Sequence, residues 1–286
     1  MMKRYTVIIL SLILVICALF SGCAESLGIG SDKLTVKIEN GEAIVTEIPN
    51  KSTVKEVTVP DEYEGVPVTE IADFAAVNIE SIEVINIGKN VKTISNWAFE
   101  NNQKLKAFNV SKENQYFCDV DGVLFTKDMK TLLFYPLARE IKSVEQTNEN
   151  GQKTEVKSIE YSVPEGVETI RTKAFYKCQN LTKISLPQSL KSIEEKAFFR
   201  CGSLKELALP SSLEFIGKDA FSYCSSLTET VIPASVKQID TYAFYNCTNL
   251  LKIDVAAKES DMTLGEKWYP TDNGRTIDKL KITWAE

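Results

Sequence analysis

The feature that most constrains this sequence is a motif that recurs every 23 residues between Glu165 and Ala257. Its four copies read VETIRTKAFYKCQNLTKISLP, LKSIEEKAFFRCGSLKELALP, LEFIGKDAFSYCSSLTETVIP and VKQIDTYAFYNCTNLLKIDVA. A fixed period of this length is typical of a solenoid, in which each unit stacks on the next. One unit is too short to bury its own apolar side chains, so its neighbours must present the same residue at the same height. The sequence therefore predicts a stacked-repeat fold.

Three apolar columns mark the predicted core of this solenoid. Within one unit, the spacing Leu181-x-x-Ile184-x-Leu186 predicts a short strand with alternate side chains directed inward. Proline follows three of these strands, where a missing backbone donor does least harm. The columns are Ile170, Ile193, Ile216 and Ile239; Phe175, Phe198, Phe221 and Phe244; and Cys178, Cys201, Cys224 and Cys247.

The first 22 residues predict an export signal. Lys3 and Arg4 precede an apolar run at residues 5–20, which is short for a membrane span and typical of a signal peptide. The sequence FSGC, ending at Cys23, resembles the bacterial lipobox, so we expect lipidation of Cys23; plain secretion or an uncleaved anchor are the alternatives. Residues 23–33 would then form a flexible tether. This leader predicts a bacterial protein that is lipid-anchored in the cell envelope and faces outside the cytoplasm.

Caps are expected at both ends, because an open solenoid exposes core residues and strand edges. Asn40-Gly41 between two alternating apolar segments predicts a β-hairpin, which we interpret as an N-terminal cap over residues 34–56. Repeats are expected over residues 57–257. Residues 258–286 are interpreted as a C-terminal cap containing Trp268 and Trp284, with a sugar-binding pair of tryptophans as the alternative.

The repeat extends towards the N-terminus in degenerate form. Residues 62–66 are expected to add a surface loop, and residues 111–160 are interpreted as two degenerate coils with extra loops. A hairpin is predicted at Asp121-Gly122, and a polar loop tip at residues 148–151. The predicted strand centres are Val57, Ile85, Phe108, Leu133, Tyr161, Ile184, Leu207, Thr230 and Ile253.

The composition argues against several kinds of chemistry. The chain has no histidine, which removes Ser-His-Asp, Cys-His and histidine-containing metal sites. Its net charge of -6 disfavours nucleic-acid binding. A paired-carboxylate glycosidase stays open by composition, but Glu194 and Glu195 occupy ordinary exposed turn positions in the other copies. We expect no enzyme, no cofactor and no metal site.

The cysteine column is interpreted as packing. It lacks the Cys-x-x-Cys spacing of zinc sites. Disulfides between coils are conceivable, since stacked strands lie about 4.8 Å apart, but a continuous column has no pairing scheme. Cys118 is expected in a partly buried loop. An acidic run that includes Asp119 and Asp128 resembles a calcium loop, but Phe117 stands at the first ligand position and has no oxygen to donate, so a hairpin is preferred.

The units resemble the BspA-like leucine-rich repeats of bacterial surface proteins, which read roughly L-x-x-I-x-[LI]-P-x-x-[LV]-x-x-I-x-x-x-A-F-x-x-C. The resemblance covers about residues 57–257, with Ala75-Ala76, Gly88, Ser111 and Thr230 as departures. It implies an α/β-type leucine-rich repeat solenoid, with mostly short parallel strands and irregular or helical turns. It also implies a non-catalytic recognition protein on the cell surface, in some relatives an adhesin for host extracellular-matrix or clotting proteins.

The outward side chains of the predicted sheet form the candidate binding face, because residues beside the ladder positions point away from the core. The same register exposes Leu132 and Phe134, whereas a one-residue slip exposes Leu133 and Tyr135. Either register exposes an aromatic ring beside charges, which is typical of protein recognition, unless residues 137–155 fold over it. The outward residues are Glu160, Ser162, Lys183, Ser185, Glu206, Ala208, Glu229, Val231, Lys252 and Asp254.

We therefore expect a membrane-anchored surface protein whose solenoid binds a protein, with a host matrix protein as one candidate partner. A structural envelope lipoprotein with only homotypic contacts is the alternative. A carbohydrate-binding or carbohydrate-active solenoid is a third hypothesis. The outer face of the sheet distinguishes the first two hypotheses.

Overall fold

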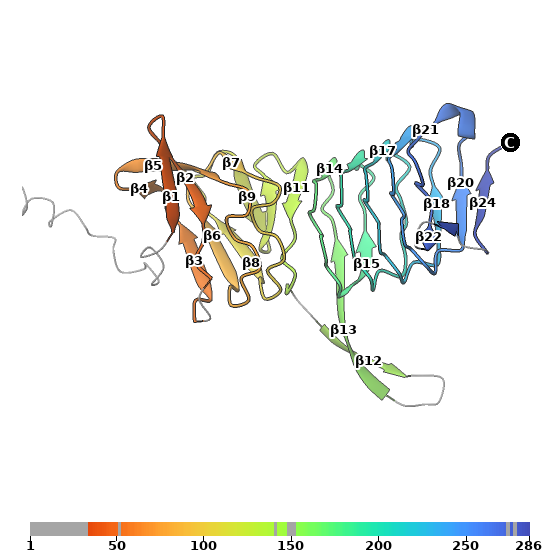
Figure 1. The fold of residues 1–286 in the computed structure, drawn as a ribbon, viewed down its shortest axis with the longest axis horizontal. Coiled ribbons are helices and arrows are strands. Elements are labelled where there is room, and N and C mark those ends of the chain that lie inside the picture. The colour runs from red at the N-terminus through yellow and green to blue at the C-terminus, as the bar shows by residue number, and fades with distance from the viewer. Residues whose placement is uncertain (1–33, 51–52, 140–141, 148–152, 273–274, 277–278) are drawn as a thin grey trace, which may run out of the picture.

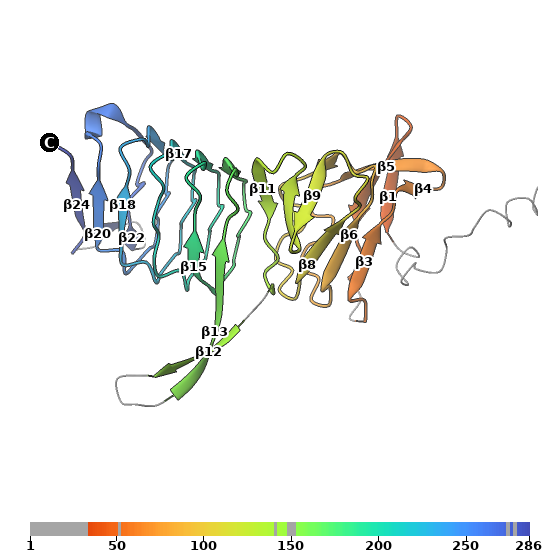
Figure 2. The ribbon, with the colours of Figure 1, turned by 180° about the vertical axis from the view of Figure 1, so that it is seen from behind.

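The computed structural model describes residues 34–286, except 51–52, 140–141, 148–152, 273–274 and 277–278. The expected signal peptide, the lipidation site Cys23, the tether and the tip at residues 148–151 lie outside the described residues. The described part is an elongated solenoid of short strands (Figures 1 and 2). Its helical content is a single 3-10 turn, Glu259–Asp261, so the turns predicted as irregular or helical are irregular.

One side of the solenoid is formed by the leucine-rich strands, here called the repeat strands. They form two separate parallel sheets. The N-terminal repeat sheet contains β3 (Glu56–Val59), β6 (Val84–Ile87) and β8 (Ala107–Val110). The C-terminal repeat sheet contains the end of β13 (Lys153–Ser162), β15 (Leu181–Ser185), β18 (Glu229–Ile232), β20 (Lys252–Val255) and β24 (Lys281–Trp284). The C-terminal repeat sheet is divided at the coil around Leu207, because β13–β15 and β18–β20–β24 are separate ladders that this coil connects through isolated bridges, Lys183 to Glu206 and Ala208 to Val231.

A second side is a ladder of shorter strands, several with only two residues. Ile170 pairs with Ile193, and Ile216 pairs with Ile239, so the isoleucine column of the sequence is a true ladder. The N-terminal part comprises β1 (Thr35–Glu39), β2 (Glu42–Glu47), β4 (Glu62–Tyr63), β5 (Val66–Ile71) and β7 (Thr93–Ile94). The C-terminal part comprises β9 (Phe117–Val120), β10 (Val123–Thr126), β11 (Thr131–Phe134), β14 (Thr169–Ile170), β16 (Ser192–Ile193), β17 (Phe215–Ile216), β19 (Gln238–Ile239) and β21 (Thr263–Leu264).

The third side consists of the turns that carry the A-F-x-x-C motif. Backbone hydrogen bonds link successive coils there, as from Phe198 N to Ala220 O at 2.8 Å. Most of these turns place two residues in the left-handed region, for example Lys196 (φ 55) and Arg200 (φ 60). These two corners direct the phenylalanine inward, where the rings of the column stack with centroids 4.8 to 5.2 Å apart.

Two hydrophobic cores fill the solenoid. One runs from Leu34 to Phe134, and the other runs from Val123 to Trp268. They meet at β10 and β11, where Leu124 belongs to the first core and Phe125 to the second. The two cores divide the molecule into an N-terminal half and a C-terminal half.

The two hairpins predicted from Asn-Gly and Asp-Gly pairs are confirmed. β1 and β2 join at Asn40 and Gly41, both at positive φ, and β9 and β10 join at Asp121 and Gly122. Gly122 is also required sterically, since a Cβ there would lie 2.8 Å from that of Ala107. The loop expected at residues 62–66 is instead a small antiparallel pair formed by β4 and the start of β5.

The strand centre predicted at Leu133 is wrong. The chain reverses at β9 and β10, so β11 pairs antiparallel with β10 and joins the short-strand ladder through β14. Residues 132–135 are all buried, so no aromatic stands exposed on the sheet face in either register. The ring of Phe134 packs against Phe99 and Phe108 in the N-terminal core.

The stretch 111–160 is therefore not two ordinary degenerate coils. After β11, the chain forms a long hairpin from β12 (Lys142–Thr147) and the first part of β13, which projects from the solenoid body (Figures 1 and 2). The last residues of β13 then return to the C-terminal repeat sheet.

The C-terminal residues add one more strand to the C-terminal repeat sheet. β24 pairs in parallel with β20, with Ile282 opposite Ile253. Trp268 is 4% exposed and packs edge to face on Trp284, with ring centroids 6.0 Å apart. This burial closes the second core and leaves no free pair of indole faces for a sugar. A small hairpin of β22 (Thr271–Asp272) and β23 (Arg275–Thr276) lies nearby in the sequence.

Candidate functional site

The outer face of the C-terminal repeat sheet carries the residues that the sequence placed there. Glu160 lies beside Lys183, and Ser162 lies beside Ser185. Of the ten predicted outward residues, Asp254 is half-buried and the others are exposed. They are Glu160, Ser162, Lys183, Ser185, Glu206, Ala208, Glu229, Val231, Lys252 and Asp254. The exposed aromatic predicted beside them, Phe134, is absent from this face because it is buried in the N-terminal core.

A groove of about 650 Å³ lies in the middle of this face. Its position coincides with the irregular coil around Leu207, where continuous strand pairing is lost. Thr230 occupies a ladder position that is aliphatic in the neighbouring coils, and its hydroxyl donates to the carbonyl oxygen of Leu207 at 3.2 Å. A polar side chain in the ladder thus bonds to the backbone of the adjacent coil. The groove is lined by Lys205, Glu206, Leu207, Ala208, Leu209, Thr228, Glu229, Thr230, Val231, Lys252 and Asp254.

The groove combines an apolar centre with charges of both signs. Val231 is 54% exposed, which is unusual for a valine beside a sheet core. Lys252 forms an ion pair with Asp254 at 2.7 Å. Hydrogen bonds from Lys252 and Thr283 lower the pKa of the Asp254 carboxyl. Glu229 lies directly opposite Lys252 on the adjacent strand, so the charged row is electrostatically paired on that side.

The N-terminal repeat sheet presents a different surface. The amide of Asn109 donates to Asn86 at 2.9 Å, and the amide of Asn86 donates to Glu56 at 2.8 Å and to Thr58 at 3.1 Å. This ladder, in which Glu56 is the charged member, borders a recess of about 440 Å³. Gly88 shapes the recess, because a Cβ there would lie 2.8 Å from the backbone of Pro60. The amides mostly satisfy one another and offer few free groups.

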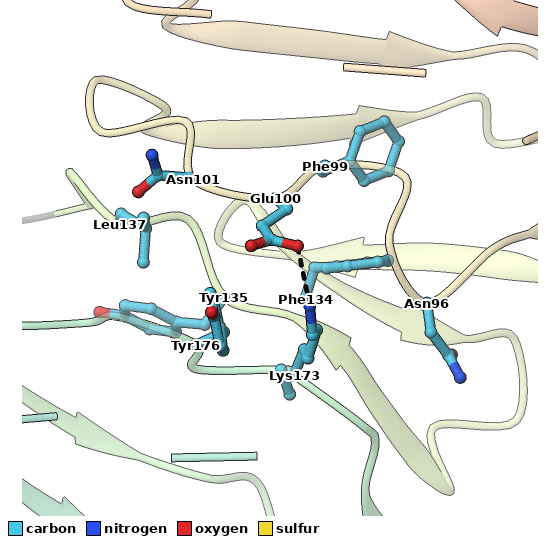
Figure 3. Close-up of a pocket in the computed structure, with 10 residues that line it drawn as sticks. Asn96, Phe99, Glu100, Asn101, Phe134, Tyr135, Leu137, Lys173 and Tyr176 are labelled. Carbon is cyan, nitrogen blue, oxygen red and sulfur yellow. Dashed lines mark hydrogen bonds and ion pairs between the residues drawn. The ribbon is translucent and has the colours of Figure 1, made fainter. Parts of the chain in front are cut away.

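A small pocket lies where the two halves meet (Figure 3). Lys173, from the C-terminal half, forms an ion pair with Glu100 of the N-terminal half at 2.8 Å, with side-chain exposures of 3% and 16%. The Lys173 ammonium also lies over the ring of Trp97. The pocket volume is about 30 Å³, which is room for about one water molecule. We therefore interpret it as a structural joint.

Arg171 strengthens the same joint. Its guanidinium donates to the carbonyl oxygen of Ile94 at 3.0 Å and lies 4.5 Å from the ring centroid of Phe134. Burial lowers the pKa of Arg171 to about 10, so it stays charged at neutral pH. The turn position of Arg171 predicts an ordinary exposed residue, and this prediction is wrong. Its equivalents in the next copies are Glu194 and Gly217, so no column signalled the contact.

The carboxylates considered for chemistry have structural partners. Glu194 accepts hydrogen bonds from the backbone and hydroxyl of Thr172 at 2.9 and 3.1 Å, and Glu195 pairs with Lys196 at 2.6 Å. Asp119 accepts from the backbone nitrogen of Val110 at 2.7 Å. These contacts assign the carboxylates to turns and to the β9–β10 hairpin.

The cysteine column contains free thiols that do more than fill space. The sulfurs of Cys201 and Cys224 lie 3.2 Å from the carbonyl oxygens of Phe175 and Phe198 in the preceding coils, within hydrogen-bonding distance for a thiol donor. Burial raises the pKa of the Cys178 thiol to about 12. Burial also raises the pKa of the Cys201 and Cys224 thiols, so both are protonated donors at neutral pH. Cys118, expected in a loop, is half-buried in β9.

Solved structures with similarity to this chain include several bacterial proteins. Among solved structures, the pneumococcal vaccine antigen PcpA has a TM-score of 0.60 and 23% identity, covering 82% of this chain and 57% of that chain. This chain thus spans less than two thirds of that structure. A leucine-rich repeat protein from Eubacterium ventriosum has a TM-score of 0.49 and 16% identity, covering 78% of this chain and 83% of that chain. A leucine rich cell surface protein from Faecalibacterium prausnitzii has a TM-score of 0.45 and 24% identity, covering 73% and 62%.

A search of curated proteins finds no match. In the described part of the chain, no helix is long and apolar enough to cross a membrane. The family described as the BspA type leucine rich repeat region matches residues 40–123 and 152–266 in six copies, which is well over half of the sequence. This match agrees with the stacked strands, the isoleucine ladder and the A-F-x-x-C turns. The chain belongs to the BspA-type leucine-rich repeat family.

Proposed function

We propose that this chain is a non-catalytic recognition protein that binds a protein partner on the outer face of its C-terminal repeat sheet. The observation that carries the proposal is the groove at the irregular coil, with the exposed Val231 at its centre. Protein interfaces combine an apolar centre with a polar rim, and the charged row on either side of Val231 supplies such a rim.

The surface chemistry favours a protein over a polyanion. The groove contains Glu206, Glu229 and Asp254 as well as Lys205 and Lys252, so its charge is mixed rather than basic. Nucleic acids require a basic footprint, which a chain with a net charge of -6 lacks. Mixed charge instead provides specificity, because a partner must match each sign in its place.

The proposal includes display outside the cytoplasm on a lipid anchor. The basic start, apolar run and FSGC sequence ending at Cys23 support it. Host matrix or clotting proteins are the proposed partners. Replacement of Cys23 by serine should abolish incorporation of labelled palmitate in the producing cells and release the chain from the membrane fraction. Labelling that persists in the Cys23→Ser variant would remove the anchor from the proposal.

The binding face is tested with a charge swap, Lys183→Glu combined with Glu206→Lys. These residues are bridge partners on adjacent coils, so the swap keeps their mutual attraction but reverses the pattern that a partner meets. We expect binding to purified matrix and clotting proteins to weaken about ten-fold, with an unchanged melting temperature. The measurement is surface plasmon resonance with the full chain in a non-ionic detergent.

The matched control swaps an ion pair on the other half, Lys106→Glu with Glu83→Lys, whose wild-type residues form a salt bridge near the N-terminal repeat sheet. This control should leave the affinity unchanged. Equal affinity for wild type and the Lys183/Glu206 swap, together with a ligand that protects only the caps from hydrogen exchange, would reject the proposed face.

A further inference from the structure

A continuous row of aromatic side chains runs along the turn side of the C-terminal half. Tyr176 stacks on Phe199 with ring centroids 5.2 Å apart and planes 9° apart. Phe199 meets Tyr223 edge to face at 5.3 Å, and Tyr223 meets Tyr245 at 5.7 Å. Tyr242 completes the row against Tyr245 at 5.3 Å. All five side chains are half-buried. We call these five residues the aromatic ridge.

The core does not need this ridge, because the buried phenylalanine column already fills the space between coils. Two ridge residues also occupy unfavourable backbone positions, since Tyr223 and Tyr242 both have φ of 62°. Bulky L-residues adopt this left-handed region at a cost, whereas asparagine tolerates it better. Asn246, one coil after Tyr223 at the equivalent position, shows that asparagine fits this turn. The backbone cost of the tyrosines is therefore unexplained by folding alone.

The ridge is absent from the N-terminal turns. Asn78 and Asn101 stand at the positions equivalent to Lys177 and Arg200, and the amide of Asn101 donates to Asn78 at 2.5 Å. Val77 and Glu100 stand at the positions equivalent to Tyr176. Phe74 and Trp97 do form an aromatic pair in these turns, with ring centroids 5.6 Å apart, at the positions equivalent to Tyr242. The N-terminal turns therefore lack aromatic rings only at the positions of Tyr176 and Tyr223.

Three cations contact ridge rings. Lys173 lies 4.5 Å from the ring centroid of Tyr176 but is paired with Glu100, and the other two are Arg200 and Lys177. The Arg200 guanidinium is 5.6 Å from the ring centroid of Phe199 and 5.1 Å from that of Tyr223. The Lys177 ammonium is 5.1 Å from the ring centroid of Tyr176. Neighbouring lysines are neutralised, as Lys196 is by Glu195 and Asp219. Among the described residues, by contrast, Arg200 and Lys177 have no carboxylate within ion-pair distance.

We propose that the aromatic ridge is a second interaction surface and binds an acidic segment of a partner protein. Arg200 and Lys177 supply the charge complement, and the equivalent turns of adjacent coils present them to the same side. Tyr176 and Phe199 stack on each other, which covers one face of each ring, and Lys173, Lys177 and Arg200 lie over these rings as well. The ring edges, which carry partial positive charge and attract carboxylates, are the parts offered to a partner. Flat ring faces, which a sugar would need for stacking, are not offered by this pair. Tyrosine and arginine are also the residues most enriched at protein-binding hot spots.

The test uses labelled twelve-residue peptides and the full chain in a non-ionic detergent. One peptide alternates glutamate with leucine, and a second carries lysine in place of glutamate. Fluorescence anisotropy should show saturable binding of the glutamate peptide alone, weakening as salt is raised. Arg200→Glu should weaken this binding about ten-fold or more. The Lys183/Glu206 swap on the repeat sheet should leave it unchanged, which separates this proposal from the proposed function.

Tyr223→Asn distinguishes recognition from packing. Asparagine suits the left-handed backbone at this position, so the melting temperature should stay the same or rise, while peptide affinity should fall. A lower melting temperature with unchanged affinity would make the ridge a packing device and overturn the proposal. No binding of the glutamate peptide, equal binding of the lysine peptide, insensitivity to Arg200→Glu, or binding only of a carboxylated polysaccharide such as hyaluronate would overturn it as well.

Discussion

The two halves of the solenoid fill their cores with aromatic rings in different arrangements. In the C-terminal half, Phe175, Phe198 and Phe221 recur at one height, and neighbouring rings in the column lie within 12° of parallel. In the N-terminal half, Ala76 takes one position of this column, and Phe99 meets Phe108 and Phe134 at 50° and 70°. Parallel stacking requires identical residues in successive coils. Where the column is broken, rings from other elements fill the core at steeper angles.

One polar contact is common to both halves of the solenoid. Cys201 lies with its sulfur 3.2 Å from the carbonyl oxygen of Phe175, which is 26 residues earlier. In the N-terminal half the equivalent Asn102 donates its amide to the carbonyl oxygen of Ala76, also 26 residues earlier, at 2.9 Å. Thiol and amide thus perform the same task at the same corner. Either residue type can therefore supply the donor, whereas Ile79, at the equivalent position of another N-terminal turn, has no side-chain donor.

The largest expected effect comes from the regular column. Phe198→Ala should destabilise the chain by about 3 to 5 kcal/mol, because the residue is fully buried between two stacked rings. Phe199→Ala, one residue along on the half-exposed ridge, should cost far less. Urea titration of both variants measures the difference. Equal losses would show that the column is not the principal packing element of the C-terminal half.

The joint between the halves should be the next most sensitive place. Glu100→Gln removes the carboxylate that pairs with the buried ammonium of Lys173, and it should cost about 2 to 4 kcal/mol. Because the pair links the two cores, calorimetry should show a broader transition that separates into two steps. A single sharp transition with unchanged melting temperature would mean that the ion pair does not couple the halves.

The shared donor position should respond more strongly in the N-terminal half. Asn102→Ala removes bonds to Ala76, Phe99 and the backbone nitrogen of Ile79, so we expect a loss of about 2 kcal/mol. Cys201→Ala removes one weak thiol contact and should cost about 1 kcal/mol. Chemical denaturation with and without reductant checks both values. A native mass that is four hydrogens below that of the reduced chain would show that the column cysteines form disulfides, which would contradict the thiol-donor assignment.

The smallest effect is electrostatic and depends on pH. Glu168 bonds to Lys130, from the irregular coil, and to Lys191, from the next regular coil, and these contacts lower its pKa to about 2. A lowered folded-state pKa stabilises the protein fully above the usual glutamate value of about 4.3, and this contribution disappears as the pH falls towards 2. Glu168→Gln should therefore lower the melting temperature slightly at pH 7 and not at pH 2. An equal difference at both pH values would contradict this assignment.

The regular half was largely predictable from the sequence, because its physics is repetitive. A constant 23-residue spacing fixes which residues share a ladder, and the alternation within a strand fixes which side chains face out. The outward positions of Lys183 and Glu206 followed directly from that spacing. The groove did not follow, because the coil around Leu207 keeps the regular spacing of the repeat although its strand pairing is reduced to isolated bridges.

In the irregular half, the spacing failed to predict the fold because the chain changes direction once, at β9 and β10. The hairpin at Asp121 and Gly122 was predicted, but its consequence, the transfer of Leu133 to the other ladder, requires knowing where the antiparallel strands dock. Arg171 and Lys173 were equally hidden, since their partners lie more than 70 residues earlier in the chain. Local patterns carry no information on such contacts.

The solenoid contains two cores of unequal regularity, and native-state hydrogen exchange of the full chain tests this division most directly. Stacked, fully buried coils open only with the whole unit, whereas irregular ones open separately. We predict that the slowest amides lie in the C-terminal half, in β14, β16, β17 and β19, and exchange together. The amides of β5 and β7 should form a second, faster group. Uniform exchange along the solenoid, or slowest exchange in the N-terminal half, would contradict the division into two cores.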